Sequence, residues 1–282
     1  MSSQVISDQA INNQAIGDWV QTFWLSILQG LTEFLPISSS GHLILLPSLL
    51  GWEDQGLVFD VAVHVGTLIA VVFYFRKEVL LLVTDWARSL LGGPVTVYSR
   101  LAWAIGFATV FVGVAGVLFE SLIDDVFRNP IPIAIATIVF GIVLGLTDRY
   151  GKRVRDIHSV GWRDVCIIGF AQAIALIPGT SRSGITISAG LAVGLTREAA
   201  ARFSFLLSIP VILLAGGWQG RKLLGQGNNS IDIPLLIFAI MISALFAFIC
   251  IHYFLRFIDR VGLMPFVIYR LFLGIILILV FM

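Results

Sequence analysis

Residues 36–42 read PISSSGH and residues 178–184 read PGTSRSG, and each stretch interrupts a long apolar run. These runs extend over residues 19–50 and 165–195. Proline removes a helix donor and clashes with the preceding turn, and the glycines and serines that follow favour irregular backbone. The halves of each run are too short for a comfortable membrane crossing. Both runs are therefore predicted to form re-entrant helix-loop-helix hairpins with their tips at membrane depth.

Six uninterrupted apolar runs accompany the two broken ones. The chain is 58% apolar and only 12% charged, which is too apolar for a soluble domain. A net charge of +1 gives no reason to expect a nucleic-acid partner. We therefore predict an all-α integral membrane protein, a polytopic helical bundle in the bilayer. Its expected spans are residues 59–75, 101–119, 131–146, 203–217, 233–255 and 265–282.

The two breaks resemble each other. Both contain Ser-x-Ser-Gly after a proline, and Gln29 and Gln172 lie seven and six residues before those prolines. Each hairpin precedes three spans, which predicts an internal repeat of roughly 140 residues. The predicted organisation is a polar N-terminal tail (1–18), a first repeat (19–147, hairpin 19–50), a cytoplasmic linker (148–164) and a second repeat (165–282, hairpin 165–195).

Loop charge predicts the orientation. Of the 18 Lys and Arg residues, 13 lie in residues 76–100, 148–164, 194–202 and 256–264. Loops rich in Lys and Arg face the cytoplasm. The opposite ends of the spans keep Arg128, Arg221 and Lys222. Both termini are therefore expected outside. The first hairpin then enters from the outer face and the second from the cytoplasmic face, so the two repeats have inverted topology.

The first break concentrates reactive side chains. Gln29 and Glu33 are four residues apart and share a helix face. A carboxylate inside a membrane segment is costly and is usually functional or paired. The alternative for Glu33 is a structural ion pair with Arg182, and Gln29 could simply bridge helices. The next candidate side chains are Ser38, Ser39, Ser40 and His42. The alternative role for the serines is helix capping, and the alternative for the histidine is a structural one.

The second break supplies positive charge. Arg182 stands at the expected N-terminal end of a short helix, where free N–H groups attract anions. Its planar guanidinium suits two-point binding of phosphate oxygens. Hydroxyl groups surround it on Ser181, Ser183 and Thr186. An acid, hydroxyls, an imidazole and an anion cradle together fit phosphoryl transfer, in which positioning and charge neutralisation dominate.

These motifs resemble the undecaprenyl-pyrophosphate phosphatase family, also called the bacitracin-resistance BacA/UppP family. Its Glu/Gln-x-x-x-Glu motif matches residues 29–33, and its Pro-x-Ser-Ser-x-Gly-His motif matches residues 36–42. Its Pro-Gly-x-Ser-Arg-Ser-x-x-Thr motif matches residues 178–186. The similarity continues through residues 203–207 and 265–270 and covers nearly the whole chain after the tail. Where many relatives have glutamate, this chain has Gln29. The glutamine argues against a mechanism that needs two carboxylates.

The resemblance implies a hydrolase that converts undecaprenyl pyrophosphate to undecaprenyl phosphate and inorganic phosphate. Such an enzyme recycles the lipid carrier of cell-wall synthesis and gives bacitracin resistance. The family also implies a divalent cation, Mg²⁺ or Ca²⁺, and a multi-pass protein of the bacterial inner membrane with its site facing the periplasm. A homodimer is one option for the oligomeric state.

We expect the site between the two hairpin tips. Arg182 binds the pyrophosphate, helped by Ser181, Ser183 and Thr186, with Ser38 and Ser40 also counted as substrate-binding. Glu33 either holds the cation or acts as base, and Gln29 positions it or the substrate. Ser39 is the preferred nucleophile with His42 as proton carrier, although His42 as nucleophile stays open.

A secondary transporter or flippase for an anionic or lipid-phosphate substrate is the alternative function. Inverted repeats and broken helices at mid-membrane are also typical of transporters. The Ser, His and Glu side chains beside one arginine exceed what anion binding requires, which favours the enzyme.

Overall fold

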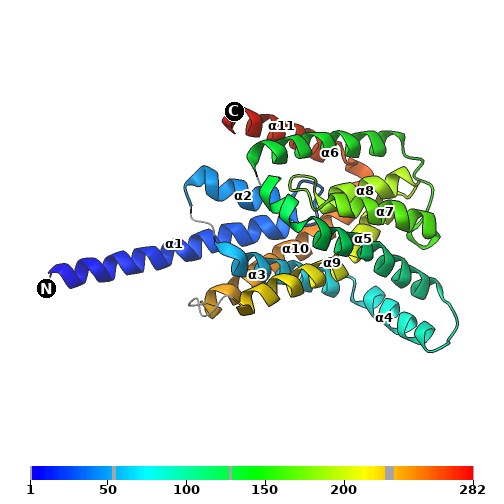
Figure 1. Cartoon of the computed structure of the whole chain (residues 1–282), viewed down its shortest axis with the longest axis horizontal. Helices are drawn as coiled ribbons and strands as arrows, with labels where there is room; N and C mark the ends of the chain where they lie inside the picture. Colours follow the sequence, from blue (N-terminus) through cyan, green and yellow to red (C-terminus); the bar gives the residue numbers. More distant parts are fainter. Residues whose placement is uncertain (1, 53–54, 127–128, 226–231, 282) are drawn as a thin grey trace.

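The computed structural model describes residues 2–52, 55–126, 129–225 and 232–281 (Figure 1). Throughout these residues the chain forms helices and no β-strand. The first half contains α1 (Ser2–Thr32), α2 (Ser39–Leu50), α3 (Gly56–Tyr74), α4 (Arg76–Leu90), α5 (Val97–Val126) and α6 (Pro130–Tyr150). The second half contains the short helix η1 (Ile157–Ser159), then α7 (Trp162–Ile174), α8 (Arg182–Ala192), α9 (Arg197–Gly225), α10 (Ile233–Val261) and α11 (Met264–Phe281).

Six helices in the described part of the chain are long and apolar enough to cross a membrane. They are α3, α5 from Val97 to Phe119, α6, α9 from Arg197 to Arg221, α10 and α11. Each overlaps one of the six expected spans, so the prediction of an all-α integral membrane protein is confirmed. Large apolar side chains on these helices point outward, among them Phe73, Leu213 and Met241. In a bilayer such side chains face lipid instead of water.

The two broken runs fold as pairs of helices joined at the predicted breaks. The first pair is α1 and α2, and the second is α7 and α8. The helices α2, α7 and α8 have only 12, 13 and 11 residues, too few to cross a bilayer alone. The helix α1 is longer because it also includes residues of the polar tail. Inside the bundle, the two breaks lie against each other.

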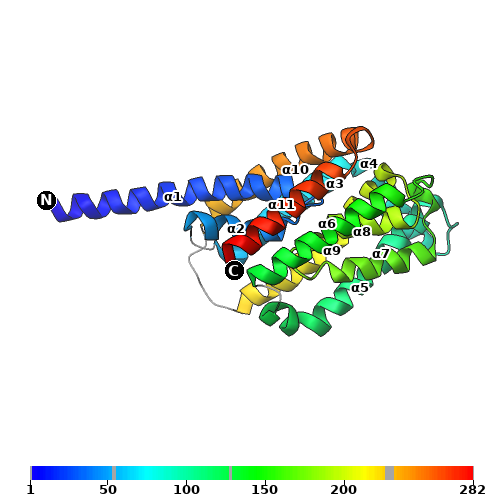
Figure 2. The same cartoon turned by 90° about the horizontal axis from the view of Figure 1, so that it is seen from above.

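The ends of the bundle differ in charge. Figure 2 shows that α1 begins and α11 ends at the same end. The other end contains α4 and the turn between α10 and α11, and the four segments rich in Lys and Arg gather there. Ion pairs connect helices at this positive end, such as Arg197 Nε to Asp148 Oδ1 at 2.6 Å. Burial alone would raise the pKa of Asp164, but hydrogen bonds from Arg155 and the Gly161 N–H outweigh it and lower that pKa.

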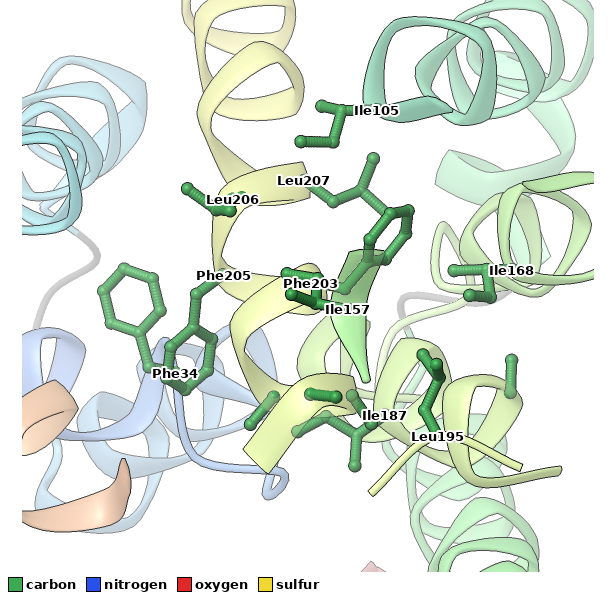
Figure 3. Close-up of a cluster of buried hydrophobic side chains, with 14 of the residues drawn as sticks. Phe34, Ile105, Ile157, Ile168, Ile187, Leu195, Phe203, Phe205, Leu206 and Leu207 are labelled. Atoms are coloured by element: carbon green, nitrogen blue, oxygen red, sulfur yellow. The ribbon is translucent and has the colours of Figure 1, made fainter. Parts of the chain in front are cut away.

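The apolar core lies directly beside the first break. Phe34 is fully buried and packs edge-on against Phe205 of α9, with 5.1 Å between the ring centroids. Figure 3 shows these rings together with side chains from α8 and α9, including Ile187 and Leu206. An edge-to-face aromatic pair contributes about 0.5–1.5 kcal/mol, and in a bilayer such packing, instead of the exclusion of water, holds helices together. Phe34 therefore anchors the break and fixes the backbone that presents Glu33.

Candidate active site

One carboxylate, that of Glu33 at the end of α1, collects side chains from both breaks. Its Oε2 accepts hydrogen bonds from Gln29 Nε2 at 3.0 Å and from Ser39 Oγ at 2.7 Å. Its Oε1 accepts from Arg182 Nη2 at 2.8 Å. The Glu33 side chain is only 8% exposed. Four predicted site residues from two distant segments thus meet in one buried cluster.

The local backbone of the two breaks is nearly the same. Ser38 and Ser181 have positive φ angles of 74° and 69°. Their hydroxyls accept the N–H groups of Gly41 and Gly184, at 3.4 and 3.1 Å. Both serines are therefore N-caps, the alternative considered for Ser38 from the sequence. Positive φ costs a serine about 1–3 kcal/mol, and such strain is concentrated at functional sites.

These matching caps place Ser39 and Arg182 in equivalent positions. Each is the first residue of a short helix, α2 or α8, and each donates to Glu33. Helix N-termini carry a positive dipole end and N–H groups without an intrahelical partner. Two such termini converge beside the Arg182 guanidinium, which makes the cluster suitable for a phosphate group.

Arg270 of α11 ties both breaks together, although no role is predicted for it from the sequence. It is fully buried. Its guanidinium donates to Pro36 O at 3.2 Å, Gly179 O at 2.9 Å and Thr137 O at 3.1 Å. Gly179 has φ +89°, and an added Cβ would lie 2.3 Å from Ile133 O, so only glycine fits there. In the sequence, the only indication of this role is that Arg270 is an arginine within an otherwise apolar span.

The structure connects His42 with the first break and with α11. Its Nδ1 lies 2.7 Å from Ser38 O, and its Nε2 lies 2.5 Å from the Tyr269 hydroxyl. A carbonyl only accepts, so Nδ1 carries the proton and Nε2 accepts from Tyr269. Both ring nitrogens are therefore engaged away from Glu33.

A second histidine, His64 of α3, lies beside the carboxylate and is absent from the predicted site. Its Nε2 is 3.7 Å from Glu33 Oε2, and its Nδ1 is 2.7 Å from Asp60 O. Nδ1 therefore donates to the Asp60 carbonyl, and Nε2 faces Glu33. The side chain is 34% exposed. A titratable residue inside the span 59–75 is the signal that identifies it.

The remaining predicted residues support this cluster. Ser183 Oγ donates to Leu35 O at 2.8 Å, which links α8 to the first break. Thr186 Oγ1 lies 2.7 Å from Ser204 Oγ, and Ser204 O accepts from Arg182 Nη1 at 3.1 Å. Ser40 is exposed, with its hydroxyl 3.5 Å from that of Ser38. These contacts fix the orientation of the arginine and of the two helix starts.

The donor atoms fit a divalent cation only if the substrate completes its ligand set. Among the described residues no group of three or more His, Cys, Asp and Glu side chains could hold a metal. Gln29 Oε1, however, is buried and has no hydrogen-bond partner there. This amide oxygen and the Glu33 carboxylate are hard ligands. Mg²⁺ commonly combines one or two such ligands with substrate phosphate oxygens.

Comparison with known proteins identifies relatives along nearly the whole chain. The family described as bacitracin resistance protein BacA matches residues 22–276. The undecaprenyl-diphosphatase of Nitrosococcus oceani is 54% identical over 264 residues, covering 94% of this chain and 99% of the relative. Undecaprenyl-diphosphatase 2 of Stutzerimonas stutzeri is 53% identical, with 94% and 98% covered. The undecaprenyl-diphosphatase of Thioalkalivibrio sulfidiphilus is 52% identical, with 94% and 99% covered.

Proposed function

Because this chain belongs to the bacitracin resistance protein BacA family, we propose that it hydrolyses undecaprenyl pyrophosphate to undecaprenyl phosphate and inorganic phosphate. It is a membrane-bound hydrolase whose product is a lipid carrier for cell-wall synthesis, and the same activity gives bacitracin resistance. The transporter alternative is not favoured. The relatives with 52–54% identity are all named for the diphosphatase activity.

The observation that carries the mechanism is the contact of Ser39 with Glu33. A hydroxyl 2.7 Å from a buried carboxylate oxygen is a nucleophile beside a general base. The other carboxylate oxygen is held 2.8 Å from Arg182, so an anion-binding group lies within reach of the same carboxylate.

The reaction then follows from these positions. Glu33 Oε2 takes the proton of Ser39 as Oγ forms a bond to the terminal phosphorus. The anhydride P–O bond breaks, and the lipid monophosphate leaves with the electron pair and accepts the proton from Glu33. Arg182 and the N-termini of α2 and α8 neutralise the charge of the transferring phosphoryl group. Glu33, again ionised, then takes a proton from water as the water oxygen bonds to phosphorus. The bond between Ser39 Oγ and phosphorus breaks, Oγ leaves with the electron pair and recovers the proton from Glu33, and inorganic phosphate is released.

Phosphate release from a prenyl pyrophosphate by the purified protein in detergent tests this function. Release without any ion gradient is expected. Saturable uptake into proteoliposomes without phosphate release would instead identify a transporter or flippase.

A divalent cation, Mg²⁺ or Ca²⁺, is part of the proposal and would neutralise charge on the pyrophosphate when bound. Gln29 Oε1 and phosphate oxygens of the substrate would hold it, and Glu33 would join them only in the alternative in which it is not the base. Removing divalent cations with EDTA is expected to suppress turnover. Gln29→Ala should raise the half-saturating Mg²⁺ concentration about tenfold, whereas Gln29→Glu should lower it, because a carboxylate binds the hard cation more strongly. Equal Mg²⁺ dependence in wild type and both variants would exclude Gln29 as a ligand.

Helix packing supports two inverted repeats with re-entrant hairpins. The helix α1 packs on α10 as α7 packs on α5, and α3 packs on α10 as α9 packs on α5. The pairs α3 with α9 and α6 with α11 join equivalent helices across the expected two-fold axis. In Figure 2 the two hairpins approach the centre from opposite ends. This is the arrangement in which broken helices place a site near mid-membrane.

Both termini are proposed to be periplasmic, in a multi-pass protein of the bacterial inner membrane with its site open to the periplasm. The native cysteines, exposed Cys166 and buried Cys250, would first be replaced by serine. A single cysteine added before Met1 or after Met282 should then react with an impermeant maleimide in cells with a permeable outer membrane. A cysteine at Lys152, at the positive end, serves as the control and should react only after lysis. The reverse pattern contradicts the orientation.

A further inference from the structure

A cavity of about 670 Å³ lies at the positive end of the bundle, where α3 meets α4 beside α9 and α10. None of the residues that contact Glu33 lines it. Its basic lining residues are Arg76, Lys77, Arg202 and Arg256, and its apolar lining includes Phe75 and Leu255. The span α3 ends at Tyr74, which also lines the cavity, so the cavity lies at the surface of the membrane.

Positive charge in this cavity exceeds negative charge. Its two carboxylates, Glu78 and Glu198, both pair with Arg202. Within the described part of the chain, the three other cations have no carboxylate within 4.0 Å. The guanidinium of Arg76 lies 5.0 Å from the Phe73 ring centroid, and that of Arg256 lies 5.8 Å from the Phe257 ring centroid. Three cations are thus available for an anionic ligand.

Two buried polar atoms of cavity-lining residues lack a partner among the described residues. They are Arg202 Nε, a donor, and Glu78 Oε2, an acceptor. Both atoms belong to the Arg202–Glu78 ion pair and are closed to solvent, so this pair forms part of the cavity wall. The ligand therefore meets the three other cations.

We propose that this cavity binds the head group of an anionic phospholipid, such as phosphatidylglycerol. Its phosphate would lie between Arg76, Lys77 and Arg256. The acyl chains would leave along Tyr74 and Leu255 into the bilayer. Basic pockets between membrane helices bind lipid head groups in this way, and the volume is in the range of ordinary ligand sites.

The cavity is connected with the active site through α9. Arg202 lies two residues before Ser204, whose carbonyl oxygen accepts from Arg182 at 3.1 Å. The binding itself does not rest on the proposed phosphatase activity, because it is measured without substrate.

Thermal unfolding of the full-length protein in detergent tests the proposal with added short-chain lipids. A ligand that binds the folded state raises the unfolding temperature with its concentration. Dioctanoyl phosphatidylglycerol is expected to stabilise the wild type, whereas dioctanoyl phosphatidylcholine and inorganic phosphate at equal concentration are not.

The cavity variant Arg76→Gln, Lys77→Gln, Arg256→Gln should lose at least tenfold in apparent affinity for phosphatidylglycerol. The matched variant Arg100→Gln, Arg149→Gln, Lys152→Gln removes three cations near the same end without touching the cavity, and should bind like the wild type. Equal stabilisation of the cavity variant and the wild type would overturn the site. Equal stabilisation by inorganic phosphate would overturn its assignment to a lipid.

Discussion

Replacing Arg182 with lysine is expected to lower kcat/KM for the lipid pyrophosphate at least a hundredfold, nearly as much as replacement with alanine. The arginine acts at two points, because Nη2 contacts Glu33 Oε1 and Nη1 contacts Ser204 O. A lysine keeps the charge but has one nitrogen, so it cannot keep both contacts and also grip a phosphate with a planar fork. Loss of a charge-stabilising donor typically costs about a hundredfold to a thousandfold in rate.

Phosphate release in detergent measures this effect, with Arg149→Lys as the matched control. Arg149 is an exposed residue at the end of α6 and should tolerate lysine without loss of activity. A lysine variant at residue 182 that keeps most of the wild-type kcat would make Arg182 a structural partner of Glu33, the alternative raised by their direct contact. The second break would then not be the phosphate-binding element.

The helices of this fold were accessible to prediction because membrane insertion imposes simple rules. Apolar length determines the spans, and proline followed by glycine and serine ends a helix wherever it occurs. The sequence also indicates the ion pair between Glu33 and Arg182 as an alternative, because buried charges of opposite sign pair in an apolar medium. Even the likeness of the two breaks was visible as Ser-x-Ser-Gly, which the structure explains as two equivalent caps.

Contacts between distant segments could not be predicted from the sequence by these rules. The bond between His42 and Tyr269 joins residues 227 positions apart, and the three carbonyls held by Arg270 belong to three different elements. Neither follows from periodicity, because each depends on how helices rotate when they pack. The sequence predicts α4 only as part of a positively charged segment, because this helix is too polar to form a span. The sequence marks His64 only as a titratable residue inside an expected span, and nothing in that span indicates that it meets Glu33.

Ser39→Ala is expected to leave only trace turnover at every pH, because no other described hydroxyl donates to the Glu33 carboxylate. Glu33→Gln should be equally severe, since it removes the base and the partner of Arg182. Ser40→Ala is the control. Its hydroxyl is within the same turn but contacts Ser38, so most activity should remain. Ser38 is unsuitable as a control, because it caps α2 with a positive φ.

Replacing either histidine should affect turnover differently from replacing Ser39. His42→Ala removes the contact with Tyr269 and should keep a small residual rate that rises with added imidazole, as expected of a proton carrier in a water-accessible site. His64→Gln tests the imidazole whose Nε2 lies 3.7 Å from Glu33 Oε2, and its loss should lower kcat more than it changes KM. A nucleophile, in contrast, has no substitute in solution. If Ser39→Ala stays active, His42→Ala is inactive and a phosphohistidine can be trapped, the nucleophile is His42. The Tyr269 hydroxyl must then leave His42 Nε2 before each turnover, because that nitrogen's lone pair is occupied in this structure.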